Sequence, residues 1–298
     1  MIIETQSTRV LAGRPVKGEV VTNTKETLQI KSARLTLACV EETHIRTRIP
    51  FIARDREQKN SSPPSRFLGA YEKSVIMERS LTLRGEDTIS PPGARFPFEL
   101  EIPTDALPSY SGRSATVGWR LEAKVVPALE PEIVAETEVT VLPMAQRESR
   151  PVVAANKPGA PVGLELEVFR DIVEPGDEVE GRLTVTRLKT KPQRILVKLI
   201  AHEFAKARQT VGYQIDTSDM VLTVTGPFDR GQLQEGRSQC FTLQVPEGTV
   251  TYVGKNSSSR LLVKATAALR FRRDISSTAQ VHVGTLAQSL AGGSRQEH

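Results

Sequence analysis

The chain of 298 residues contains two copies of one sequence pattern, and this internal repeat constrains the fold more than any other feature. Three short motifs occur in the same order in both halves. The first pair lies 163 residues apart and the other two lie 143 and 142 residues apart, so the first half carries about 20 additional residues. The repeat predicts two similar domains, each large enough for its own hydrophobic core. The motif pairs are GRPVKG (Gly13–Gly18) with GDEVEG (Gly176–Gly181), FELEIP (Phe98–Pro103) with FTLQVP (Phe241–Pro246), and YSG (Tyr110–Gly112) with YVG (Tyr252–Gly254).

Apolar residues alternate with other residues at a spacing of two, which is typical of β-strands with one buried face. The alternation recurs at corresponding places in the two halves, and no segment has the spacing of an amphipathic helix. Turns rich in Gly, Pro and Asp separate the segments, as in β-sandwich proteins. The sequence therefore predicts an all-β protein with two tandem β-sandwich domains. The alternating segments include Ala33–Cys39, Trp119–Val125, Ile195–Ala201 and Leu261–Ala267.

A proline-rich stretch without extended alternation separates the two halves and predicts a linker. We expect the first sandwich at residues 1–145, the linker at 146–162 and the second sandwich at 163–284. Residues 285–298 contain two adjacent glycines and few apolar side chains, and they predict a flexible tail.

The additional residues of the first half fall at Pro50–Gly69, between two alternating segments. Long insertions in compact domains are often functional. Mixed charge with apolar residues favours a loop that becomes ordered on a protein partner, and simple disorder is the alternative. The residues expected to contact the partner are Arg54, Arg56, Phe67 and Leu68.

Two basic segments of the second half, KTKPQR (Lys189–Arg194) and LRFRR (Leu269–Arg273), predict a site for phosphorylated or lipid-headgroup anions. Strand alternation would place the first two arginines of LRFRR on one face. Solvated surface charge is the alternative interpretation. The residues of the predicted site are Lys189, Lys191, Arg194, Arg270 and Arg272.

The chain offers few candidates for catalysis or metal binding. Its four histidines are scattered, its two cysteines have no CxxC partner, and no P-loop, GxSxG or GxGxxG motif is present. We therefore expect no enzymatic activity, no catalytic residues, no metal and no cofactor. His44 and His202 are expected to be ordinary strand residues.

The acidic residues Glu41, Glu42 and Glu203 are expected to be solvated charges at strand edges, because neighbours on a strand point to opposite faces. Cys39 and Cys240 are expected to be buried, reduced thiols.

The net charge of +5 and the pI near 9.3 are compatible with acidic protein partners or anionic lipid. This charge is too small to indicate nucleic-acid binding, and an aromatic content of 5% disfavours base stacking. The first residues lack the layout of a secretory signal, and no stretch is apolar enough to span a membrane. These features predict a cytoplasmic protein without a nucleic-acid partner.

The ordered set LAGRPVKGEV, FPFELEIPTDALPSYSG and VGWRLEAKV, with its echoes IVEPGDEVEGRL, FTLQVPEG and TYVGKNSSSRLLVKATA, resembles the arrestin-like fold family. That family includes the visual and β-arrestins, the α-arrestins and the arrestin-like retromer subunit. The resemblance covers about residues 1–284 and implies two immunoglobulin-like β-sandwiches without a catalytic site. It also implies that the insertion occupies the place of the family's receptor-binding finger loop. The chain departs from the family in having no PPxY motif and no recognisable clathrin-binding segment.

The resemblance implies a cytoplasmic adaptor or scaffold that binds membrane-protein tails or trafficking and signalling complexes, with peripheral membrane contact as a further option. One alternative is a structural or sporulation-type stress protein that assembles with itself through sheet edges. Another is a sandwich that binds a small molecule or glycan, which would need a convergent polar pocket.

Overall fold

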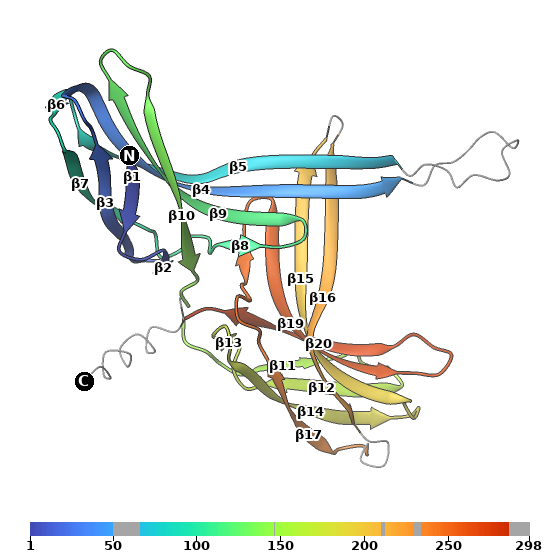
Figure 1. The fold of residues 1–298 in the computed structure, drawn as a ribbon. Helices are drawn as coiled ribbons and strands as arrows, with labels where there is room; N and C mark the ends of the chain where they lie inside the picture. Colours follow the sequence, from blue (N-terminus) through green and yellow to red (C-terminus); the bar gives the residue numbers. More distant parts are fainter. Residues whose placement is uncertain (50–65, 146, 210–211, 229–233, 286–298) are drawn as a thin grey trace, which may run out of the picture.

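The computed structural model describes residues 1–49, 66–145, 147–209, 212–228 and 234–285. These residues form strands and turns, and no helix occurs among them, which confirms the predicted all-β class. The strands make four sheets, two from the first half of the chain and two from the second half. We call these halves the first and second domains, and Figure 1 shows them as two separate sandwiches.

The first domain has ten described strands. They are β1 (Ile2–Thr5), β2 (Arg9–Leu11), β3 (Pro15–Asn23), β4 (Leu28–Ile49), β5 (Arg66–Arg84), β6 (Asp87–Ile89), β7 (Gly93–Glu101), β8 (Tyr110–Ser111), β9 (Ala115–Pro127) and β10 (Ile133–Leu142). One sheet has the order β1-β3-β7. The other has the order β2-β10-β9-β4-β5, with β6 paired to β4 and β8 paired to β9.

The second domain also has ten described strands. They are β11 (Val152–Ala155), β12 (Val162–Val168), β13 (Ile172–Val173), β14 (Glu178–Leu188), β15 (Arg194–Arg208), β16 (Tyr213–Phe228), β17 (Ser238–Gln244), β18 (Tyr252–Val253), β19 (Ser257–Ala268) and β20 (Ile275–Val283). The sheet orders are β11-β12-β14-β17 and β13-β20-β19-β15-β16, with β18 paired to β19.

The two domains share one topology. In each larger sheet a long hairpin lies beside a long strand: β4–β5 lies beside β9, and β15–β16 lies beside β19. A short strand, β8 or β18, comes directly before that long strand and pairs with it. Each larger sheet also ends in a short parallel pair of strands, β2 with β10 in the first domain and β13 with β20 in the second. The predicted pair of tandem β-sandwiches is therefore confirmed.

Each domain has its own core, formed by the residues whose alternation predicted the strands. Leu35, Leu37 and Leu121 are fully buried in the first domain, and Leu199 and Leu261 in the second.

The two cysteines lie in different surroundings. Cys39 is buried as expected, but the expectation for Cys240 is wrong because its side chain is exposed. Its neighbours Phe241 and Leu243 set the buried phase of β17, so Cys240 points outward.

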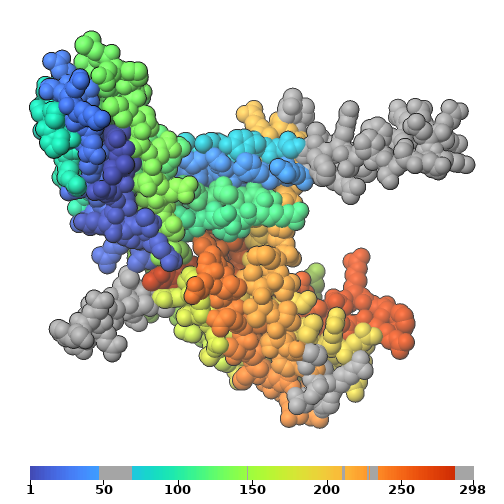
Figure 2. Space-filling view, viewed as in Figure 1, coloured from blue at the N-terminus to red at the C-terminus, as the bar shows by residue number. Residues whose placement is uncertain are grey.

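The hairpins β4–β5 and β15–β16 extend past the cores of their own domains and cross each other (Figure 1). Their far ends pack together through a small apolar cluster that includes Ile45, Ala205 and Ala207. Figure 2 shows the domains in contact across the middle of the molecule. The hairpins thus form much of the interface between the domains.

The insertion differs from its predicted bounds. Strand β4 continues to Ile49 and β5 begins at Arg66, so the backbones of Phe67 and Leu68 belong to β5, opposite Arg48 and Thr47. Residues 50–65, with Arg54 and Arg56, lie outside the described residues.

The predicted linker also differs, because residues 146–162 contain β11, which pairs with β12. We propose a shorter connection between the domains, from residue 143 to residue 151. Its start is bound to the end of the second domain, since Ala145 donates its N–H to Thr285 and Thr285 donates its N–H to Pro143. The rest of the predicted tail, 286–298, lies outside the described residues.

Candidate functional site

Two buried carboxylates join the domains. Glu41 of β4 has 0% exposure and accepts hydrogen bonds from the second domain. The backbone N–H groups of Asn256 and Ser257 donate to its two oxygens at 2.9 Å each, and the Ser257 hydroxyl donates at 2.7 Å. Asn256 ends the turn that follows β18, and Ser257 is the first residue of β19. Carboxylates accept strong hydrogen bonds from backbone N–H groups, so these bonds offset much of the free-energy cost of burying the charge.

Glu203 of β15 makes the reciprocal contact with the first domain and has 6% exposure. The backbone N–H groups of Arg113 and Ser114, in the turn that follows β8, donate to it at 3.0 and 2.8 Å. The Tyr110 hydroxyl donates to the same carboxylate at 2.7 Å. We call Glu41 and Glu203, with the turns Tyr110–Ser114 and Tyr252–Ser257, the carboxylate clasp.

The hydrogen bonds around the two carboxylates are also reciprocal. Asn256 donates through its side chain to Ser74 Oγ of β5, and Ser114 Oγ donates to Asp216 of β16. The rings of Tyr110 and Tyr252 lie between the two halves with centroids 4.9 Å apart. Burial raises the pKa of both tyrosine hydroxyls above the ordinary value, so both stay protonated.

The glycine of each turn is required by the opposite carboxylate. A Cβ atom on Gly112 would lie 1.7 Å from Glu203 Oε2, and one on Gly254 would lie 2.2 Å from Glu41 Oε1. The repeated YSG and YVG motifs therefore bring backbone against a carboxylate, a contact that a side chain would block.

The expectation that Glu41 and Glu203 are solvated strand-edge charges is wrong. Both continue the buried phase of their strands beyond the core of their own domain, where the other domain covers them. The signal was present in the sequence, because Glu41 follows Cys39 at a spacing of two. Glu42 does point outward, where Lys73 lies 3.1 Å and His44 3.7 Å away.

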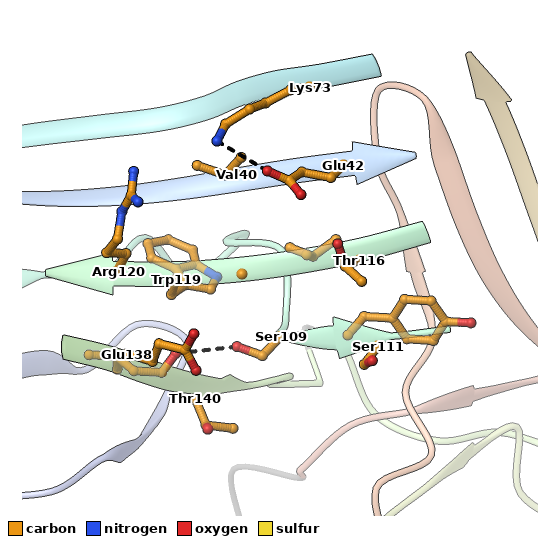
Figure 3. A pocket seen from close by; sticks show the side chains of 14 residues that line it. Val40, Glu42, Lys73, Ser109, Ser111, Thr116, Trp119, Arg120, Glu138 and Thr140 are labelled. Carbon is orange, nitrogen blue, oxygen red and sulfur yellow. Dashed lines mark hydrogen bonds and ion pairs between the residues drawn. The ribbon is translucent and has the colours of Figure 1, made fainter. Parts of the chain in front are cut away.

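A groove of about 530 Å³ with a mixed polar and apolar lining lies on the outer face of the first domain. Figure 3 shows Lys73 and Glu42 facing each other on one side of it, with Arg120 and Glu138 on the other side. Arg120 forms a 3.5 Å ion pair with Glu136, whereas Glu138 has no side-chain partner among the described residues. The dashed line from Ser109 in Figure 3 is the hydrogen bond that its hydroxyl donates to the carbonyl oxygen of Val139.

The predicted basic site is arranged differently from the expectation. Strand β19 ends at Ala268, so Arg270 and Arg272 lie in the β19–β20 turn and strand alternation does not place them. The structure does bring the two basic segments together, because Gln193 donates its N–H to the carbonyl oxygen of Ala268 at 2.8 Å.

The most exposed large apolar residue of this turn is Phe271, at 91%. It has a φ of 60°, and the Arg270 guanidinium lies 4.9 Å from its ring centroid. We call this region the basic tip. It consists of the exposed residues Lys189, Lys191, Arg194, Arg270, Phe271, Arg272 and Arg273.

His44 and His202 are strand residues, as expected. His44 stacks near Tyr71 with ring centroids 4.8 Å apart, and His202 lies 2.5 Å from the Asp219 carboxylate. Within the described part of the chain, no three His, Cys, Asp or Glu side chains gather in a group that could hold a metal. No described helix could cross a membrane.

Comparison with known proteins identifies the first domain. Residues 3–148 match the family described as "Arrestin (or S-antigen), N-terminal domain", and this range includes nearly all of the first ten strands. A comparison with curated proteins finds no match. The second domain repeats the topology of the first, in agreement with the sequence repeat. The first domain therefore belongs to the arrestin N-terminal domain family, and the fold of the chain is arrestin-like.

Proposed function

We propose that the protein is a non-catalytic cytoplasmic adaptor that binds membrane-protein tails or trafficking and signalling complexes while its basic tip contacts an anionic membrane. Membership of the first domain in the arrestin family supports an adaptor or scaffold role in general terms. The clasp supports the absence of catalysis, because backbone N–H groups of the opposite domain occupy Glu41 and Glu203.

The observation that carries the membrane contact is the exposure of Phe271 among basic side chains. Each Lys or Arg near an anionic bilayer contributes about 1 kcal/mol, and salt screens this attraction. Aromatic rings favour the boundary between headgroups and hydrocarbon. Phe271 also has a backbone conformation that costs a non-glycine residue free energy, which is common where a side chain is held for binding.

Vesicle sedimentation tests this proposal. At low salt we expect binding to vesicles that contain phosphatidylserine and little binding to phosphatidylcholine alone. The double variant Arg270→Glu, Arg272→Glu should lose most of the binding, and Phe271→Asn should weaken it while preserving thermal stability. A matched control, Lys25→Glu with Lys31→Glu, makes the same charge change on exposed residues of the first domain. Equal binding by the double variant and the wild type would contradict the proposal.

We also propose that Arg54, Arg56, Phe67 and Leu68 contribute to partner binding. Replacing residues 52–63 with a short Gly-Ser turn should leave the thermal midpoint nearly unchanged and abolish capture of protein partners from a host lysate. Intact capture would show that residues 52–63, with Arg54 and Arg56, do not contribute to partner binding. Loss of folding would show that it is structural.

A further inference from the structure

The outer groove of the first domain contains a glycine that the fold does not require. Gly118 lies in the middle of β9, between β4 and β10, and is exposed. Among the glycines inside described strands, it alone has no atom within 4 Å of the position that a Cβ would occupy. Gly18 and Gly181, by contrast, each face a backbone oxygen at 2.2 or 2.3 Å. Glycine inside a strand weakens the strand, and its presence often marks the close approach of a ligand or another backbone.

Two polar rows flank this bare position. On one side Lys73, Glu42 and Thr116 are successive cross-strand partners, and on the other side Glu138 is paired in register with Arg120. The groove at Gly118 is thus bordered by charged and hydroxyl groups. Figure 3 shows the side chains of these bordering residues.

One exposed acidic side chain of the groove, Glu138, makes no ion pair within 4 Å among the described residues, although Arg120 is its cross-strand neighbour. Lys73 neutralises Glu42, and Glu136 neutralises Arg120. Glu138 lines the groove and forms no ion pair or side-chain hydrogen bond with any described residue. A ligand that complements this groove therefore carries a cation opposite Glu138.

We propose that the groove over Gly118 binds a short extended peptide segment of a partner protein, with a Lys or Arg side chain at Glu138 and the peptide backbone over Gly118. Val40, the cross-strand partner of Gly118, provides an apolar contact for a neighbouring residue of the peptide. The polar rows provide hydrogen-bonding groups for an extended backbone. The proposal rests on the adaptor function and assigns it a class of partner that is basic and extended.

NMR titration of the ¹⁵N-labelled full chain tests the proposal. The probe is acetyl-Ser-Val-Arg-Val-Ser-amide, and the same peptide with Glu in place of Arg is the control. We expect the arginine peptide to shift the amide signals of Thr116, Gly118 and Thr140 in a saturable way, and the glutamate peptide to leave them unchanged. Failure to shift these signals at millimolar peptide, or equal shifts with both peptides, would overturn the proposal.

Variants separate the groove from nonspecific charge. Glu138→Gln should weaken binding by about fivefold, as for a partly exposed ion pair, whereas Glu130→Gln in the β9–β10 turn, outside the groove, should have a smaller effect. Gly118→Val should abolish binding with an unchanged or raised thermal midpoint, because nothing stands where its side chain would lie. Gly85→Val places a side chain in open space outside the groove and is the control.

Two results for Gly118→Val would contradict the inference. Wild-type binding by this variant would show that the peptide does not lie over residue 118, and a large loss of stability would show that the fold requires the glycine. Vesicle binding through the basic tip is measured in parallel. Groove variants that keep vesicle binding but lose the peptide distinguish this inference from the proposed membrane contact.

Discussion

At the scale of single residues, the clasp glycines are positions where a side chain should be poorly tolerated. Gly112→Ala and Gly254→Ala each place a methyl group on a buried carboxylate, and we expect each to lower the free energy of unfolding by roughly 1–3 kcal/mol. Gly118→Ala is the control and should be neutral or slightly stabilising. Urea unfolding followed by fluorescence measures the differences. Equal effects at all three positions would show that the loss reflects the general cost of replacing glycine and not the clasp.

The two thiols should differ in reactivity. Burial, with a contribution from the charge of Glu41, raises the pKa of Cys39 to about 12, so this thiol stays protonated at neutral pH. Cys240 is exposed. A disulfide reagent such as DTNB should therefore label one thiol in the native protein and two in denaturant. Cys240→Ser should abolish the native reaction, and rapid labelling of this variant would contradict the burial of Cys39.

At the scale of elements, the connection between the domains is held by one carboxylate. Asp171, next to β13, accepts hydrogen bonds from the Arg147 side chain and from the Arg150 N–H group. Burial raises the pKa of the Asp171 carboxyl, but these hydrogen bonds outweigh burial and hold the pKa below its ordinary value.

This lowered pKa predicts a pH dependence of stability. Because the folded pKa lies below the unfolded one, Asp171 stabilises the protein above about pH 4, and the contribution is lost as the pH falls through the folded pKa. The stability difference between the wild type and Asp171→Asn should therefore shrink between pH 6 and pH 3 in urea unfolding. A difference that stays constant over this range would show that the carboxylate charge does not contribute.

The strands could be predicted from sequence because each depends on its own alternation of apolar residues. Leu35, Leu37 and Leu121 are buried as that alternation requires. The basic segment at Arg270 was assigned wrongly because five residues with alternating character fit a strand or a turn, and only the partner strands decide where β19 ends. The strand β11 was missed because it has four residues and begins directly after Pro151.

The clasp and the groove depend on contacts between residues far apart in the sequence, so most of their residues could not be predicted from the sequence. Glu41 and its donor Asn256 are 215 residues apart, and their contact requires both domains to be in place. The groove has a similar origin, because Glu138 and Lys73 lie on different strands and have no local motif in common. The acidic residues in a buried phase were the one local signal that pointed to the clasp.

At the scale of the whole molecule, the clasp couples the stabilities of the two domains. Loss of either domain exposes the carboxylates to water and breaks their hydrogen bonds to the turn N–H groups, and a hydrogen bond to a charged group contributes about 1.5–3 kcal/mol. We therefore expect a single thermal transition for the wild type in calorimetry. The double variant Glu41→Gln, Glu203→Gln places amide groups against N–H donors and should split the transition into two. Two transitions in the wild type would show that the domains unfold independently.

The pairing of Ala145 with Thr285 has a consequence for a broken chain. The connection between the domains is anchored at both ends, by Thr285 on one side and by Asp171 on the other, and the clasp holds the domains together without it. A protease cut between residues 147 and 151 would therefore yield two fragments that elute as one particle from a sizing column and separate in denaturant. The same geometry makes the chain suitable for expression as two separate polypeptides that assemble after synthesis.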